Sequence, residues 1–151
     1  MYSDTVTLFN RYERSGVTLW LPTVLRGVDL NIDRAAIVAK YGEQSADNAR
    51  LHVRYTPDAA GPIIQGKRYV PPKLWALQNV EEAAQSITFT GGNSFDFFAA
   101  AEWDEPAPIL DDPSEWLDGF YNYVNSRYDH VFAISEVAMY SVIPHFEIGG
   151  K

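Results

Sequence analysis

The sequence predicts a mainly β fold, either a small antiparallel β-barrel or a sandwich, with one α-helix packed on it. Three observations predict this class: about eight short runs rich in β-branched and aromatic residues, one capped segment with helical spacing, and no strand–helix alternation of the parallel α/β kind. A length of 151 residues suits one domain, and we expect residues 1–151 to form it.

The first half of the chain contains the clearest strand patterns. Residues 5–9 form a β-prone run, and residues 17–32 form a longer one in which Pro22 indicates an edge position or a bulge. Residues 50–56 alternate regularly between apolar and polar side chains, which predicts a strand with one buried face. Residues 35–40 favour a strand, although a short helix also fits the pattern.

The second half returns to β character around one helical segment. Residues 87–90 and 95–99 predict a hairpin, because Gly91 and Gly92 lie in the short loop between them. Further strands are expected at residues 67–70, 131–134, 137–143 and 145–148.

One helix is predicted at about residues 112–126. Asp112 can cap it, Pro113 suits the first helical position, and Glu115 completes the pattern three residues after the cap. Gly119 inside the segment weakens the prediction, since glycine costs about 1 kcal/mol relative to alanine. The residues at helical spacing are Trp116, Leu117, Phe120, Tyr121 and Val124.

Charge is distributed unevenly along the chain, whose formal net charge is −8. No lysine or arginine occurs between Lys73 and Arg127, although this stretch contains ten acidic residues and includes an acidic, proline-rich connector at about residues 100–113. A solvated acidic loop explains this pattern; so does a head-to-tail ring in which basic and acidic surfaces of neighbouring copies meet. The ten are Glu81, Glu82, Asp96, Glu102, Asp104, Glu105, Asp111, Asp112, Glu115 and Asp118.

The sequence offers little reaction chemistry. The chain has no cysteine, which excludes disulfides and thiolate sites, and its histidines, His52, His130 and His145, are far apart and lack metal-ligand spacing. Adjacent acids such as Asp111 and Asp112 point apart on extended chain, unlike the facing carboxylates of a glycosidase. We therefore expect no enzyme activity, no cofactor and no metal site, with an acid-pair hydrolase as the last alternative.

Aromatic residues suggest contacts with other molecules. The chain has four tryptophans and nine tyrosines. Trp116 lies on the predicted apolar stripe and is expected in the core, whereas Trp103, among acids and prolines, is the candidate for an exposed contact. Exposed tryptophans also occur in sugar-binding modules, so a carbohydrate-binding β-sandwich stays open as an alternative.

Membrane insertion and tight DNA binding are not expected. Residues 1–10 lack the basic start and apolar core of a signal peptide, and no apolar run approaches the ~20 residues that span a bilayer. A strongly acidic chain is poorly suited to gripping phosphates, although it could line a passage for DNA.

Several blocks of the sequence, in order, resemble small minor capsid proteins of tailed bacteriophages, which are encoded in the head-to-tail joining region. The blocks are residues 5–12, 20–25, 66–75, 128–135 and 144–151. Residues 76–110 resemble nothing that we can name.

The resemblance implies a structural virion protein of the neck, with a β-barrel core, made in the host bacterial cytoplasm. Such proteins form a homo-oligomeric ring below the portal or head-to-tail adaptor, close the head, and receive the tail. DNA would pass through the ring without sequence-specific binding, and a tail-completion or tail-tube-end role is the nearest alternative. Acidic side chains facing the channel would repel the phosphates. The interface or channel candidates are Glu81, Glu82, Glu102, Trp103, Asp104, Glu105, Asp111 and Asp112.

Overall fold

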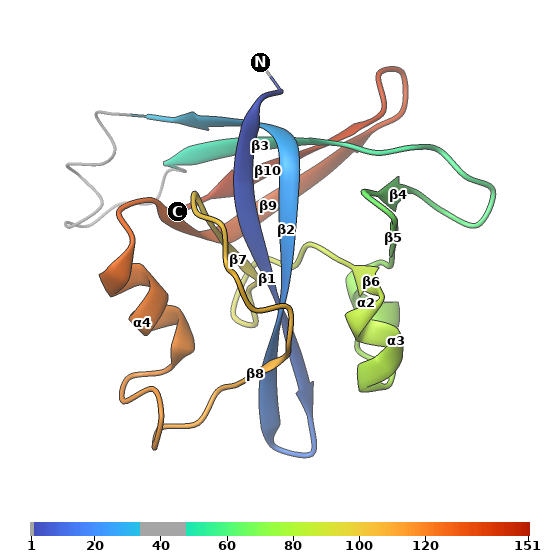
Figure 1. Ribbon diagram of the computed structural model, residues 1–151. Coiled ribbons are helices and arrows are strands. Elements are labelled where there is room, and N and C mark those ends of the chain that lie inside the picture. The colour runs from blue at the N-terminus through green and yellow to red at the C-terminus, as the bar shows by residue number, and fades with distance from the viewer. Residues whose placement is uncertain (1, 34–47) are drawn as a thin grey trace.

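The strands close into an antiparallel barrel (Figure 1). The computed structural model describes residues 2–33 and 48–151. Strands follow one another in the order β1-β7-β9-β10-β3-β2, and pairing of β2 with β1 closes the circle. The predicted mainly β fold is confirmed, in its barrel form. The bounds are Asp4–Arg14 (β1), Val17–Ile32 (β2), Ala49–Arg54 (β3), Phe97–Ala99 (β7), Val131–Tyr140 (β9) and His145–Gly150 (β10).

A long hairpin of β1 and β2 forms one wall of the barrel and continues beyond it (Figure 1). β1 extends to Arg14, past the predicted end at residue 9, because its polar half still pairs with β2. Pro22 lies opposite Phe9 of β1, between the stretches of β2 that pair with β8 (Ile109–Leu110) and with β3. Its missing N–H therefore interrupts no ladder, which confirms the predicted edge-like position.

The C-terminal strands β9 and β10, with β3, form the opposite wall. Leu51, Val53, Phe146 and Ile148 face the barrel core and are buried. The two strands predicted at residues 131–134 and 137–143 form one continuous strand, β9, which ends at Tyr140 because residues 141–143 form a turn. The expected break is a β-bulge at which Gly149 pairs with Glu136 and Gly150 with Ile134.

Gly150 has a packing reason to be glycine. A Cβ atom there would lie 2.7 Å from the Cβ of Phe132 and 3.0 Å from the ring of Phe98. Such distances are not tolerated, so the end of β10 can cross the core only without a side chain.

The predicted hairpin at residues 87–99 is wrong. β6 (Ser86–Ile87) pairs in parallel with β5 (Lys67–Tyr69), whereas β7 pairs with β1 and β9. Together with β4 (Ile63–Ile64), β5 and β6 form a separate small sheet. Two short helices not anticipated from the sequence, α2 (Pro72–Trp75) and α3 (Val80–Ala84), lie beside it.

The predicted helix begins later than residue 112. α4 spans Phe120–Arg127, because Gly119 has a φ of 91°, a left-handed conformation that no helix contains. Residues 113–118 form turns instead, and Leu117, expected in the apolar stripe, is 87% exposed.

An aromatic cluster attaches α4 to the barrel. Phe120 packs edge-on against Phe9 at 5.4 Å between ring centroids, and Phe9 stacks on Phe97 at 4.8 Å. Trp20 joins from β2, 4.9 Å from Phe97. Such pairs add to the apolar burial that fixes the helix on the barrel.

Residues 35–40, predicted as a strand, lie outside the described residues. Residues 100–108 form an irregular connector between β7 and β8. In the part of the chain that the structure describes, no helix is both long and apolar enough to cross a membrane.

Candidate functional site

Several of the acidic candidates have partners within the chain. Asn79 and Glu82 form a capping box on α3, in which each side chain accepts a hydrogen bond from the other residue's backbone N–H. Glu102 forms an exposed ion pair with Arg26 at 2.7 Å, and this pair lowers the pKa of the carboxyl group.

Asp111 and Asp112 act as caps. The Asp111 carboxylate accepts hydrogen bonds from the indole N–H of Trp20 and from the backbone N–H of Phe120, each at 3.0 Å, and thereby caps α4. The Asp112 carboxylate accepts from the backbone N–H of Ser114, which lowers its pKa. The predicted cap at Asp112 thus starts a turn, while its neighbour caps the helix.

The other acidic candidates, Glu81, Asp104 and Glu105, lie exposed. The candidates belong to three separate segments: α3, the connector at residues 100–108, and the turns before α4. In Figure 1, α3 and these turns lie on opposite sides of the β1–β2 hairpin. The structure therefore does not gather the acidic candidates into one cluster on a single chain.

The expectation of an exposed Trp103 is wrong. Its ring packs edge-on against Phe9 at 5.6 Å and Phe120 at 5.4 Å, its indole nitrogen is buried, and its backbone N–H donates to Thr7 Oγ1. Trp116 lies against Phe120 and is partly buried, close to its predicted core position.

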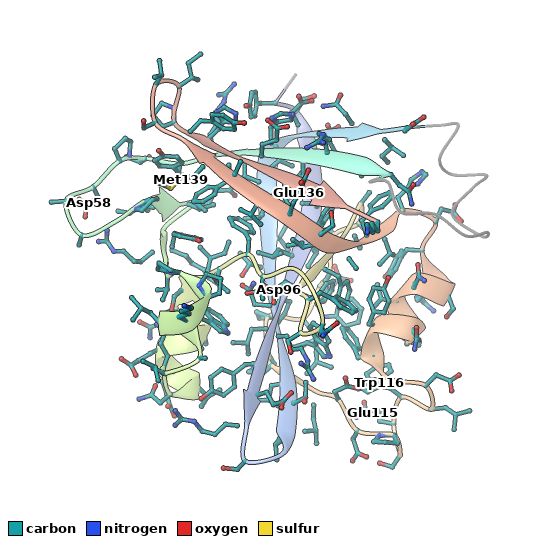
Figure 2. The ribbon with its side chains drawn as sticks, turned by 180° about the vertical axis from the view of Figure 1, so that it is seen from behind. Asp58, Asp96, Glu115, Trp116, Glu136 and Met139 are labelled. Carbon is teal, nitrogen blue, oxygen red and sulfur yellow. The ribbon has the colours of Figure 1, made fainter. Side chains whose placement is uncertain are left out.

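Apolar side chains are concentrated at the turn between β9 and β10. We call residues 139–143 the hairpin tip; it projects from the barrel in Figure 1, and Met139 marks it in Figure 2. Val142 is 96% exposed and Ile143 is 74% exposed, with Met139 and Tyr140 about half exposed. Exposed apolar groups in such a concentration typically mark a contact surface.

The base of the hairpin tip is held in place. The Tyr55 hydroxyl donates a hydrogen bond to the backbone oxygen of Tyr140 at 2.8 Å, and the Tyr55 backbone N–H donates to that of Pro144. The Tyr140 ring stacks on His145 at 4.9 Å. The tip is therefore presented by an ordered arm.

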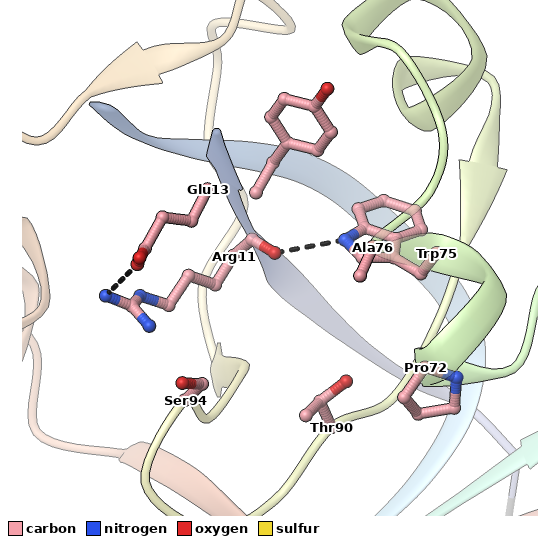
Figure 3. Close-up of a pocket in the computed structure, with 8 residues that line it drawn as sticks. Arg11, Glu13, Pro72, Trp75, Ala76, Thr90 and Ser94 are labelled. Carbon is pink, nitrogen blue, oxygen red and sulfur yellow. Dashed lines mark hydrogen bonds and ion pairs between the residues drawn. The ribbon is translucent and has the colours of Figure 1, made fainter. Parts of the chain in front are cut away.

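A cavity of about 260 Å³ lies between β1 and α2 (Figure 3). Its rim carries an Arg11–Glu13 ion pair of 2.7 Å, and its wall includes Trp75, whose indole N–H donates to the backbone oxygen of Arg11. This volume is below the usual 300–1,000 Å³ of small-molecule sites.

Asp96 is hydrogen-bonded to two residues that line this cavity, Arg11 and Thr90, and is 1% exposed. Its carboxylate accepts hydrogen bonds from the backbone N–H groups of Arg11 and Thr90 and from the Asn10 side chain. Burial nevertheless raises its pKa to about 7, against the lowering effect of these donors. Asp96 is the last residue of the loop at residues 90–96, and its hydrogen bonds to Asn10 and Arg11 connect this loop to β1.

The structure brings two of the histidines together, contrary to the sequence-based expectation. The ring centroids of His52 and His145 are 5.7 Å apart, and Glu147 completes a partly buried group whose nearest ligand atoms all lie within 4.8 Å of one another. His52 and His145 are far apart in sequence, which argued against a metal site, but the pairing of β3 with β10 places them close together in space.

A comparison with family models identifies the group of proteins to which this barrel belongs. The model of DUF6751, a family of unknown function, matches residues 1–151. The chain belongs to the DUF6751 family. No curated protein and no solved structure matches it.

Two features of this DUF6751 member were missed in the sequence, and each had a signal. Val142 and Ile143 directly precede Pro144, which places apolar residues at a turn between two strands. Asn79 and Glu82 have capping-box spacing. The histidine pair had no such signal, because only the strand register reveals it.

Proposed function

We propose that this protein is a structural component of the head-to-tail connector of a tailed bacteriophage, a ring that closes the head beneath the portal or adaptor and receives the tail. The sequence resemblance supplies the class of protein. The observation that carries the proposal in the structure is the hairpin tip, an ordered arm with nearly fully exposed Val142 and Ile143.

A closed barrel suits assembly through projecting arms. The barrel strands pair around the whole circle, so they offer few free edges for strand addition between copies. Contacts then depend on side chains and projections, and the hairpin tip is an apolar projection of this kind. A tip that inserts into a different surface of the next copy forms a head-to-tail contact, which gives a ring when the rotation between copies closes.

The exposed acidic side chains support the part of the proposal in which DNA passes through the ring. Glu81, Asp104 and Glu105 lie exposed on separate segments, so several copies could contribute them to one channel. Their repulsion of phosphates acts within a Debye length of ~8 Å at physiological salt. In this proposal a part of residues 102–118, or Glu81 and Glu82, faces the channel, and DNA slides past without being bound.

The test uses the double variant Val142→Ser, Ile143→Ser, mixed with the portal and adaptor of the phage that encodes the chain. Light scattering after size exclusion should show the unchanged protein in a multi-copy complex and the variant as free chains. Leu77→Ser is the matched control, since Leu77 is as exposed as Ile143 but lies between α2 and α3, outside the hairpin tip and the segments proposed to face the channel. Equal assembly of unchanged protein and double variant, or no assembly of either, contradicts the proposal.

A tail-completion role stays as the second candidate, because the hairpin tip serves it equally well. It predicts that the protein joins isolated tail tubes in preference to portal complexes. The carbohydrate-binding alternative relied on an exposed Trp103, and this ring is packed against Phe9 and Phe120 instead.

A further inference from the structure

We infer that His52, His145 and Glu147 form a site for one zinc ion on the outer face of the barrel. The inference is independent of the proposed neck function. His52 is on β3, and the other two ligands are on β10.

Strand register places the three side chains on one face. His52 lies directly opposite Glu147, and His145 precedes Glu147 by two residues, so it points to the same side of the sheet. The flanking residues Leu51, Val53, Phe146 and Ile148 all point inward and are buried in the core. The ligand face is therefore fixed by the packing of the opposite face, and a register slip would bury the charged groups.

The spacing is suitable for a shared ion. The nearest ligand atoms lie within 4.8 Å of one another, whereas ligands of a tetrahedral zinc ion lie about 3.3 Å apart, given Zn–N distances of about 2.0–2.1 Å. Binding of the ion requires the three side chains to rotate and close this difference. Two imidazoles and a carboxylate are a ligand set that zinc accepts, with the fourth position left to water.

One tautomer of His145 suits both its contact with the backbone and a metal ion. Its Nδ1 lies 2.7 Å from the backbone oxygen of Ile143. A carbonyl oxygen only accepts, so this contact is a hydrogen bond when Nδ1 carries the proton, which leaves the Nε2 lone pair free. Metal-binding histidines commonly have such an outer partner, and stacking on Tyr140 further fixes the ring.

The neighbouring charges have opposite effects on an incoming cation. Asp29 lies opposite His52 on β2, so its carboxylate favours a cation at this face. Arg50 forms ion pairs of 3.1 Å with both Glu147 and Glu136. Its guanidinium orients Glu147 but repels the metal, so we expect that removing this charge will strengthen binding.

The test is calorimetric titration of zinc chloride into the tag-free, EDTA-treated chain. One zinc ion per chain is expected, and His52→Ala and His145→Ala should each weaken binding about tenfold or more. His130→Gln is the matched control, because His130 lies after α4 and stacks on Phe132 away from the site. It should bind zinc as the unchanged chain does.

A variant with the opposite effect separates ligand loss from unfolding. Arg50→Gln should bind zinc several-fold more tightly, an outcome that damage to the fold would not produce. Circular dichroism should show the same β-rich spectrum for every variant. The inference is overturned if the unchanged chain binds no zinc at micromolar concentrations, or if the His52→Ala, His145→Ala double variant binds it undiminished.

Discussion

Asp96 is the buried titratable group whose surroundings allow a pH prediction. Its pKa rises from the ordinary 3.8 to about 7, mainly through burial, although three donors hold the carboxylate. The folded protein therefore retains this proton over a range in which the unfolded chain has lost it. The stability that this group contributes is fully present below about pH 4 and falls as the pH rises towards 7.

We predict that Asp96→Asn removes this pH dependence. Relative to the variant, the unchanged protein should lose unfolding free energy as the pH rises from about 4 to 7, on the order of 1 kcal/mol per pH unit. Urea unfolding of both proteins at pH 5 and pH 8 measures it. A parallel pH response in the two proteins would contradict the assignment to Asp96.

At the residue scale, sequence identified candidates but not their partners. The sequence offers Asp111 and Asp112 as interface or channel candidates and Asp112 as a helix cap, yet only the structure shows which backbone N–H group each carboxylate accepts from. The proximity of His52 and His145 depends on a strand pairing across most of the chain, which no local pattern encodes. The burial of Asp96 likewise depends on long-range packing.

At the element scale, Gly119 determines where α4 starts. Its φ of 91° and ψ of 157° are accessible essentially to glycine alone. The predicted start of the helix is wrong because Asp112 and Pro113 begin a turn. The helix begins only after Gly119, where the chain changes direction.

Gly119→Ala should lower the unfolding free energy by about 1–3 kcal/mol, the cost of such backbone strain. Steric overlap contributes little, since the added Cβ would meet only Asp111 Oδ1 at 3.6 Å. Chemical denaturation measures the change. Asn125→Ala, exposed within α4, is the control and should change stability by no more than about 0.5 kcal/mol. Equal losses of unfolding free energy in the two variants would show that a side chain at position 119 causes no backbone strain.

Strands with strong local patterns were predictable. β2 has the bounds expected from its sequence, and β3 shows the expected alternation. The false hairpin at residues 87–99 shows the limit: both segments are β-prone and a glycine loop joins them, but β6 and β7 pair with different partners. Turn residues indicate where the chain bends, whereas the pairing is decided by the hydrophobic faces of distant strands.

The hairpin tip should not contribute to the stability of the isolated chain. Because Val142 and Ile143 are mostly exposed, replacing both by serine should change the unfolding free energy by no more than about 0.5 kcal/mol per site. Thermal and urea unfolding measure this. Destabilisation well beyond that range would mean that the tip packs on its own barrel and is unavailable for partners.

At the scale of the whole molecule, the barrel presents its distinctive surfaces on different elements. The hairpin tip continues β9 and β10, the histidine group lies on the outer face of β3 and β10, and exposed acids lie on α3 and on the connector before β8. Such separation suits a subunit that contacts several neighbours at once. Charge asymmetry was visible in the sequence, but its division among separate segments was not.

An electron-microscopy map of the virion neck, at a resolution that traces strands, tests the proposed function most directly. We predict a ring of these six-stranded barrels beneath the portal or its adaptor, with Val142 and Ile143 of each copy buried against a neighbouring subunit. A neck built without this chain, or a ring in which the hairpin tips point into solvent, would contradict the proposal.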